Sequence, residues 1–300
     1  VNPKVVNRSQ TLHSIRDVTR PSNQARVMVR IIEIPPINGE DFASQVAAKR
    51  DILNKISVRS NRQNPIKKWD LVSNDDFQLE IYRYFRRRGW FYERRVREWR
   101  QRSRELKSVQ IRHAINIKNL TQYIVSYYWN KPKMGPATAK RETGDLFEGE
   151  IYEQVRKTPV EVVYQIFQVS DNIRVVLSDI NGAKYSKYLK THASLTLFCL
   201  LVRAFQEVEV KWGSPDFTTL LDDHADDWVG KRSSNWKKLT KSAINYIYAE
   251  YQVEVKRAKK KDKDVPTIIN YFKNQKSIAK LIKKPVPAEL KRLARKVIEN

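Results

Sequence analysis

Hydrophobic positions along the chain follow two patterns, with a change near residue 105. Before that point, short blocks alternate between the apolar spacing of strands and that of helices. The β-branched residues of 26–34 predict a strand, and the wider apolar spacing of 41–56 predicts a helix. A strand ending at Val6 and a helix from about Gln10 are expected before them. The pattern therefore predicts a small α/β portion over residues 1–105.

Within this portion, residues 73–92 predict a capped helix followed by a strand. Ser73 with Asp76 three positions later has the pattern of an N-cap, and helical apolar spacing continues over 74–88. Arginines crowd the last turn of that helix, where positive charge suits the helix dipole, and Gly89 is suited to end it. The aromatic run 90–92 then favours a strand.

After residue 105 the apolar spacing is helical almost throughout. A broad apolar stripe predicts a helix over 111–129, and the run 131–136 contains helix breakers that predict a loop. Thr158 with Glu161 has the pattern of a capping box for a helix that ends near residue 180. Further helices are expected from Ser214-Pro215, over 267–281 and over 288–298. The fold is therefore expected to be α+β and predominantly α-helical, with an α/β portion at 1–105 and a helical portion at 106–300.

Charge changes this picture most. The chain has 58 Lys+Arg against 33 Asp+Glu and a formal net charge of +25, for which a polyanionic partner is the simplest reason. Residues 83–118 hold thirteen Lys or Arg and three acids, and residues 256–300 hold fifteen and four. The first region is rich in arginine and aromatic residues, which suits phosphate contacts and base stacking. The second region is rich in lysine, which suits looser neutralisation of a partner's negative charge. For both regions, the alternative is that the charged side chains form solvated helix faces.

Cysteine content and hydropathy bear on the cellular compartment. The single cysteine, Cys199, lies in the apolar run 195–205, where core packing is expected, and it excludes a disulfide framework. That run is too short for the roughly 20 residues of a membrane span, so a cytoplasmic protein without a membrane partner is expected. The chain starts at Val1 on a strand-like segment, which suggests that an upstream portion, able to contain a catalytic domain, is missing.

Catalytic chemistry has little support in the pattern. A restriction-type nuclease needs a Pro-Asp and an acid-x-Lys on neighbouring strands to bind Mg²⁺ and activate water. Pro215-Asp216 and Glu254-x-Lys256 can be fitted to this, but both lie in segments expected to be helical. The acidic run 222–227 offers oxygen ligands, although a solvated loop or helix start explains it better. No P-loop is present in the sequence, so no cofactor is assigned, with Mg²⁺ reserved for the nuclease alternative.

Two segments resemble the abortive-infection phage-resistance (AIPR) family of bacteria and phages. The first is the series Asn61, Gln63, Asn64, Pro65 and Ile66, then Asp70 and Leu71, Ser73 to Asp75, Phe77 and Gln78, and Phe91 to Arg94. The second is the strand-to-helix corner from Val5 to Thr11, in which Arg8 and Ser9 stand where the family commonly has glycine. The resemblance covers roughly residues 1–155. It implies a role in bacterial defence against phage, acting through nucleic acid, and it supplies no catalytic mechanism.

The candidate binding residues follow from these patterns. Pro65 disfavours the α conformation before it, so an extended loop is expected to present amides for directional hydrogen bonds. The arginines are expected to contact phosphates and the aromatic residues to stack on bases, with burial as the alternative for any two of the latter. The expected interface comprises Arg86, Arg87, Arg88, Trp90, Tyr92, Arg94, Arg95, Arg97, Trp99 and Arg100, with Asn61, Gln63 and Asn64 on the loop. Asn7, Gln10 and Thr11 form a candidate phosphate-binding corner, for which helix capping is the alternative.

The preferred interpretation is a nucleic-acid-binding portion of a bacterial anti-phage protein, with DNA or RNA as its partner. One alternative is a metal-dependent nuclease in its own right. The other is an interaction or scaffold subunit of a defence complex, or a homo-oligomer, whose basic surface meets an acidic protein.

Overall fold

The computed structural model describes residues 45–46, 48–53, 55, 67–141, 144–180, 182, 185–226, 231–262 and 264–299. Contacts divide the chain into two units, residues 1–67 and 68–300. In the first unit, every described residue from 45 to 55 is helical, within the helix predicted over 41–56. The strands predicted before residue 35, and the helix from Gln10, lie outside the described residues.

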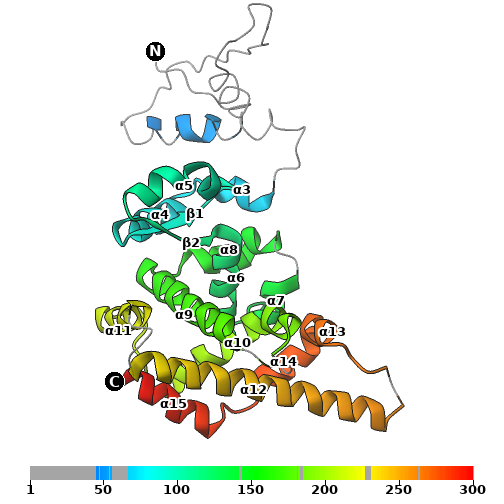
Figure 1. The fold of residues 1–300 in the computed structure, drawn as a ribbon. Coiled ribbons are helices and arrows are strands. Elements are labelled where there is room, and N and C mark those ends of the chain that lie inside the picture. The colour runs from blue at the N-terminus through cyan, green and yellow to red at the C-terminus, as the bar shows by residue number, and fades with distance from the viewer. Residues whose placement is uncertain are drawn as a thin grey trace, which may run out of the picture. The chain divides into compact units, whose positions relative to one another are not determined.

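The second unit begins with a two-stranded parallel sheet whose strands are joined through a helix (Figure 1). Its elements are α3 (Lys68–Val72), α4 (Asp76–Arg87), β1 (Trp90–Glu93), α5 (Glu98–Ser108) and β2 (Arg112–Asn116). Trp90 pairs with Arg112 and Phe91 with His113, and the register shifts beyond that point. Parallel neighbours require a crossover connection, which α5 supplies. The strand predicted at 90–92 is thus confirmed.

Helix α4 confirms the helix predicted over 74–88, but its N-cap is Asp75 rather than Ser73. The Asp75 side chain accepts a hydrogen bond from the backbone nitrogen of Gln78 at 2.8 Å. Ser73 is buried, and its hydroxyl donates to the Asp70 carbonyl at 2.8 Å. After the helix, Gly89 has a φ of 75°, a left-handed conformation that glycine adopts without Cβ strain.

The prediction of one helix over 111–129 was wrong at its start, because residues 112–116 form β2. Pairing with β1 satisfies the backbone there, which a local apolar pattern does not reveal. Asn116 then caps helix α6 (Ile117–Tyr127), its side chain accepting from the backbone nitrogen of Asn119 at 2.9 Å. The sheet therefore extends past residue 105, and that predicted domain boundary falls inside α5.

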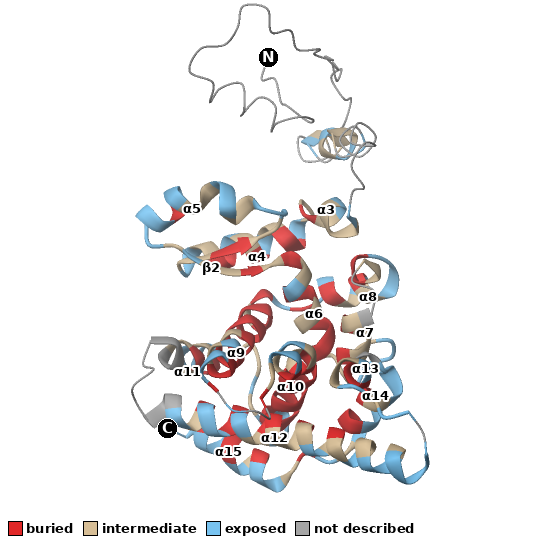
Figure 2. Ribbon diagram, turned by 45° about the vertical axis from the view of Figure 1, so that its right-hand side comes forward, coloured by how far each residue is buried: buried red, intermediate tan, exposed pale blue. Residues whose placement is uncertain are grey.

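The rest of the unit is helical, as predicted, and mixed α+β with mostly helix is the observed fold class. The elements are α7 (Pro136–Arg141), the short 3-10 helix η1 (Asp145–Phe147), α8 (Gly149–Arg156), α9 (Val160–Asp179), α10 (Lys187–Glu207), α11 (Pro215–Asp226), α12 (Lys231–Lys260), α13 (Ile268–Lys273), α14 (Gln275–Lys283) and α15 (Ala288–Ile298). Helix α10 is central, because it contacts α6, α7, α9 and all of α12 to α15. Figure 2 shows α9 and α10 as the most buried helices.

Helices α12 and α15 run antiparallel beside α10. Asn235, near the start of α12, donates its side-chain amide to the Lys296 carbonyl near the end of α15 at 3.0 Å. The buried apolar core is continuous from Phe77 in α4 to Val297 in α15. Cys199 in α10 is fully buried, which confirms its predicted core position. None of the described helices is both long enough and apolar enough to cross a membrane.

Two details of the helical prediction were wrong. Pro159, not Thr158, occupies the N-cap of α9, without a side-chain cap, and the Thr158 hydroxyl instead accepts from the Tyr128 hydroxyl at 3.1 Å. The helix predicted over 267–281 is two helices, divided at Asn274, whose side chain accepts from the backbone nitrogens of Lys276 and Ser277. Such an amide favours a new cap over helix continuation. The predicted loop is confirmed over 131–135, because Pro136 already begins α7, and the helix over 288–298 is confirmed with the predicted bounds.

Candidate nucleic-acid interface

The family-like residues of α4 and β1 form a hydrogen-bonded cluster inside the protein. Gln78 and Tyr92 are each 1% exposed, and the Tyr92 hydroxyl donates to Gln78 Oε1 at 2.5 Å. Gln78 Nε2 donates in turn to the Tyr152 hydroxyl at 3.1 Å. That hydroxyl donates to Asp75 Oδ2 at 2.5 Å, while Asp75 also caps α4. We call Asp75, Gln78, Tyr92 and Tyr152 the polar cluster.

Burial sets the protonation of this cluster. It raises the pKa of the Tyr92 phenol well above its usual value. Burial also raises the pKa of Tyr152, and its hydrogen bond to the Asp75 carboxylate adds to the shift. Both phenols therefore remain donors at neutral pH. The side-chain hydrogen bonds of the cluster link α4, β1 and α8 to one another, so the cluster stabilises the fold.

The turn before α4 is bonded to two arginines, Arg94 and Arg95, which directly follow β1. Arg94 Nη1 donates to the Ser73 carbonyl at 2.8 Å and to Asn74 Oδ1 at 3.3 Å. Arg95 Nη2 donates to the same Asn74 oxygen at 2.9 Å. Arg94 is partly buried, which lowers the pKa of its guanidinium, and the group lies 4.8 Å from the Tyr82 ring centroid. Asn74 thus fixes two adjacent guanidinium groups, and Arg94 and Arg95 form the first group of arginines.

Arg86 lies one helical turn beyond Tyr82 on α4. It is half-buried, and its Nη1 atom is enclosed without a hydrogen-bond acceptor. Its nearby acid, Glu105 of α5, is bonded instead to Arg102 at 2.9 Å, and that bond lowers the pKa of the Glu105 carboxyl. Arg86 also lowers it through the charge on its guanidinium.

Arg87 and Arg88 form a second group at the end of α4. Both are exposed, and the Arg88 guanidinium carbon lies 3.7 Å from the Tyr84 ring centroid and 5.2 Å from that of Tyr164. Beside them, Arg112 of β2 lies 4.6 Å from the Trp90 ring centroid. Stacking on a ring holds a guanidinium in place while its edges stay available for hydrogen bonds.

The third group stands at the start of α5. Arg97 precedes the helix with a φ of 66°, and both it and Arg100 are exposed. Arg104, one turn beyond Arg100, is exposed as well. Glu98, in the same turn, accepts from the backbone nitrogens of Arg94 and Arg95 at 3.3 Å. That carboxylate therefore caps backbone groups rather than pairing with these guanidinium groups.

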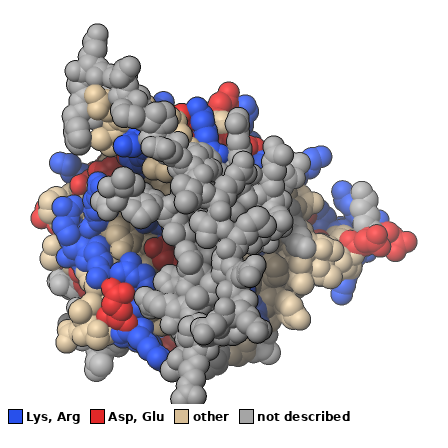
Figure 3. Space-filling model, turned by 90° about the horizontal axis from the view of Figure 1, so that it is seen from above, with Lys and Arg blue, Asp and Glu red and all other residues tan. Residues whose placement is uncertain are grey.

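Across the three groups, no ion pair joins any of the seven predicted arginines to a carboxylate in the described part of the chain. The exposed members of this set are Arg87, Arg88, Arg95, Arg97 and Arg100. Figure 3 views the molecule from the end that carries α4 and α5. On part of this face Lys and Arg side chains gather with few acidic side chains between them.

The aromatic residues differ from the expectation. Tyr92 is buried in the polar cluster, so its ring cannot stack on a base, and its placement in a binding surface is corrected. Trp99 is half-buried between Phe91 and His113, with ring centroids 5.7 and 5.1 Å away. Trp90 packs on Phe167 at 5.0 Å and lies beneath Arg112. Trp90 thus supports Arg112, whereas Trp99 packs against other rings.

The structure also bears on the alternative of a metal-dependent nuclease. Asp216 and Glu254 lie in helices α11 and α12, not on the strands that a restriction-type nuclease site uses. Glu254 bonds to Lys280 at 2.8 Å, which lowers the pKa of its carboxyl, and to Arg257. Of the acidic run 222–227, only the Asp222 side chain is described, and it accepts from Gln168 at 2.6 Å. Among the described side chains, no three His, Cys, Asp or Glu lie together as metal ligands do.

Several expected residues lie outside the described part of the chain. They are Asn7, Gln10 and Thr11 of the candidate corner and Asn61, Gln63 and Asn64 of the loop. Conversely, the structure adds Asn74 and Arg112, which sequence reasoning did not place in the interface. Asn74 stood within the family-like series, but its contact with Arg95 spans 21 residues and has no local signal. Arg112 was hidden by the mistaken helix assignment at 111–129.

Comparison with known proteins extends the resemblance. The AIPR protein family matches the chain over residues 1–296, well past residue 155, where the similarity apparent from the motifs ended. No curated protein and no solved structure matches the chain. Since the match covers nearly the whole sequence, the chain belongs to the AIPR family, an abortive-infection phage-resistance family.

Proposed function

We propose that this AIPR protein binds nucleic acid through the arginine surface, defined as Arg86, Arg87, Arg88, Arg95, Arg97 and Arg100. The observation that carries the proposal is the absence of carboxylate partners for these residues within the described chain. Unpaired, clustered guanidinium groups are costly through mutual repulsion, and a polyanion relieves that repulsion.

The contacts that we propose are mainly to phosphates. Guanidinium groups bind phosphate oxygens in a bidentate manner, and Asn74 and Tyr84 hold Arg95 and Arg88 in fixed directions before any ligand arrives. Arg94 serves as a positioning residue, because its Nη1 is engaged by Ser73 and Asn74. With Tyr92 buried and the two tryptophans packed, stacking on bases contributes less than sequence reasoning expected. Binding is therefore expected to discriminate little between base sequences.

In abortive infection, the ligand of this surface is nucleic acid of the phage or of the infected cell. The proposal assigns this surface to binding and assigns no reaction to it.

The test replaces three exposed arginines, Arg87, Arg97 and Arg100, with alanine. Binding of fluorescent single- and double-stranded DNA and RNA of one length is measured between 50 and about 300 mM salt. The slope of log K against log salt is negative, and its magnitude is expected to decrease by about one unit per lost phosphate contact, hence by up to about three.

The matched control replaces three exposed lysines elsewhere, Lys157, Lys238 and Lys241, and so removes the same formal charge. Their loss is expected to leave the slope within about one unit of the unaltered chain. Equal changes in the two triple variants would mean that only net charge matters. Failure of the unaltered chain to bind any of the four nucleic acids at 50 mM salt would reject the proposal.

A further inference from the structure

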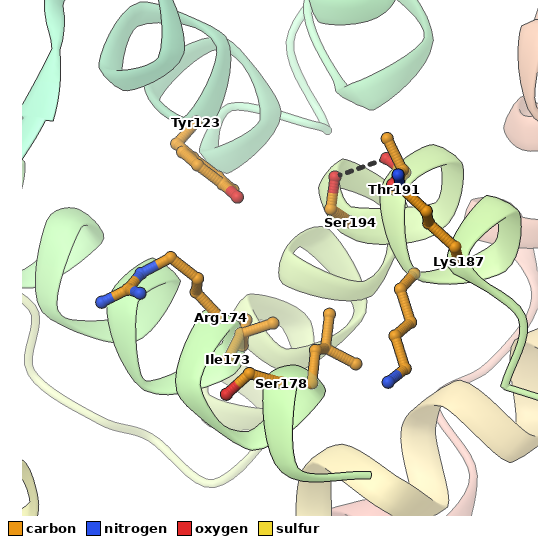
Figure 4. A pocket seen from close by; sticks show the side chains of 9 residues that line it. Tyr123, Ile173, Arg174, Ser178, Lys187, Thr191 and Ser194 are labelled. Carbon is orange, nitrogen blue, oxygen red and sulfur yellow. Dashed lines mark hydrogen bonds between the residues drawn. The ribbon is translucent and has the colours of Figure 1, made fainter. Parts of the chain in front are cut away.

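A cavity of about 430 Å³ opens between α9 and α10 (Figure 4), and none of its lining residues belongs to the arginine surface. Its volume lies within the roughly 300–1,000 Å³ of small-molecule sites. One wall is a face of α9, with Ile173 and Leu177 one turn apart. The other is a face of α10, with Lys187, Thr191 and Ser194 at helical spacing.

The lining separates into an apolar floor and a polar rim. Ile173 is 1% and Leu177 7% exposed, and the Tyr123 ring of α6 packs on Phe198 with centroids 4.9 Å apart. The Tyr123 hydroxyl points into the space between α9 and α10 (Figure 4). Burial raises the pKa of this phenol to about 12, so it stays a hydrogen-bond donor at neutral pH. A flat, partly apolar group would rest against such a floor.

The rim carries positive charge. Arg174 is engaged by Asp171, with which it forms an ion pair at 2.6 Å, and Lys190 donates to the Ile180 carbonyl. Lys187 has no partner among the described residues and is exposed. It is also the first residue of α10, where the positive end of the helix dipole adds to its attraction for an anion.

We infer that this cavity binds a nucleoside phosphate, with the base on the floor formed by Tyr123, Ile173 and Leu177 and the phosphate at Lys187 and the first turn of α10. The hydroxyls of Thr191 and Ser194 line the α10 wall between these two ends. The site shares no residue with the arginine surface, so a mononucleotide here is a ligand distinct from the polymer proposed above.

The experiment is calorimetric titration of the full chain with AMP, adenosine and inorganic phosphate. AMP is expected to bind at least about tenfold more tightly than adenosine or phosphate, because only it uses both ends of the cavity. Lys187→Glu is expected to weaken AMP binding by at least about tenfold. Glutamate favours the first turn of a helix, so this variant should keep the fold, which circular dichroism checks.

Two controls separate this site from the arginine surface. Lys157→Glu makes the same charge change at an exposed position outside the cavity and is expected to leave AMP binding unaltered. The triple arginine variant is likewise expected to bind AMP as the unaltered chain does. No AMP binding at millimolar concentration, equal affinity of AMP and phosphate, or loss of AMP binding only in the triple arginine variant would each overturn the inference.

Discussion

Tyr152 is the residue on which the polar cluster depends. Its hydroxyl receives a hydrogen bond from Gln78 of α4 and donates one to Asp75, the N-cap of that helix, while Tyr152 itself belongs to α8. A single phenol oxygen therefore joins segments 74 or more residues apart. If that oxygen is removed, the buried Gln78 amide loses a hydrogen-bond acceptor and the Asp75 carboxylate loses a donor.

Tyr152→Phe is expected to lower the free energy of unfolding by roughly 1–3 kcal/mol, the cost of leaving buried polar groups unsatisfied. Because the folded pKa of Tyr152 is raised, its contribution is fully present below about pH 10 and declines as the unfolded phenol ionises above it. The deficit of the variant should therefore shrink above about pH 10. Urea unfolding at pH 7 and pH 10.5 measures this, and a deficit that grows with pH would contradict it.

Residue-level expectations succeeded where the signal was local. Arg87 and Arg88 are exposed at the end of a helix that Gly89 terminates, as residue type and position predicted. Tyr92 could not be placed in that way, because its burial depends on Gln78 and on a partner from α8. A strand with aromatic residues on both faces offers no pattern that tells the inner face from the outer.

At the scale of elements, Arg203 connects α10 to the end of α14. This buried guanidinium, 6% exposed, donates to the Ile282 carbonyl and, at 2.9 Å, to the Lys284 carbonyl. It also lies 4.6 Å from the ring centroid of Trp129, whose indole nitrogen donates to Gln206. The carbonyls at the end of α14 lack helical partners, so Arg203 acts as their cap from another helix.

Arg203→Met keeps the apolar stem and removes the donors. The variant is expected to lose roughly 2–3 kcal/mol in the free energy of unfolding, because two carbonyls lose charged donors. Arg295→Met on α15 is the matched control, since Arg295 is exposed and its side chain has no partner among the described residues. Its effect is expected to stay within about 0.5 kcal/mol. Equal losses in the two variants by urea unfolding would show that Arg203 caps nothing.

Elements were predictable to the extent that their ends carried their own caps. The helix over 288–298 begins after a proline and carries a clear apolar stripe, and its bounds were found without error. β2 was missed because its backbone is satisfied by β1, about 20 residues away, and its five residues continue smoothly into the stripe of α6. The division at Asn274 was missed because one amide outweighed a continuous apolar pattern.

At the scale of the whole molecule, the apolar core of the described residues lies within the second unit. The continuous apolar cluster runs from Phe77 to Val297, and the arginine surface and the cavity both belong to residues 68–300. A chain of this length buries enough apolar surface to fold alone.

Residues 68–300, produced alone, are therefore expected to unfold in one cooperative urea transition with near-UV circular dichroism like that of the full chain. The salt slope for nucleic acid should be close to that of the full chain, because every arginine of the surface is retained. A non-cooperative transition would show that residues 1–67 complete the core. A cooperative transition with a much smaller slope would instead place phosphate contacts in the first unit.

The candidate site was predictable as a list of arginines but not as an arrangement. Composition and clustering identified which side chains were positive, while their sorting into three groups follows from α5 crossing between two parallel strands. Asn74 shows the same limit, since its contact with Arg95 exists only once the strand folds back beside the turn.

The interior position of the polar cluster alters what shared sequence means among related proteins. Asp75, Gln78 and Tyr92 belong to the series that marks this family, yet they face one another rather than a ligand. A substitution within the polar cluster would disturb the frame that joins α4, β1 and α8, whereas a substitution at an exposed arginine would alter the surface and leave that frame in place. Two homologues with the same signature can therefore be expected to fold alike and still differ in the molecules that they capture.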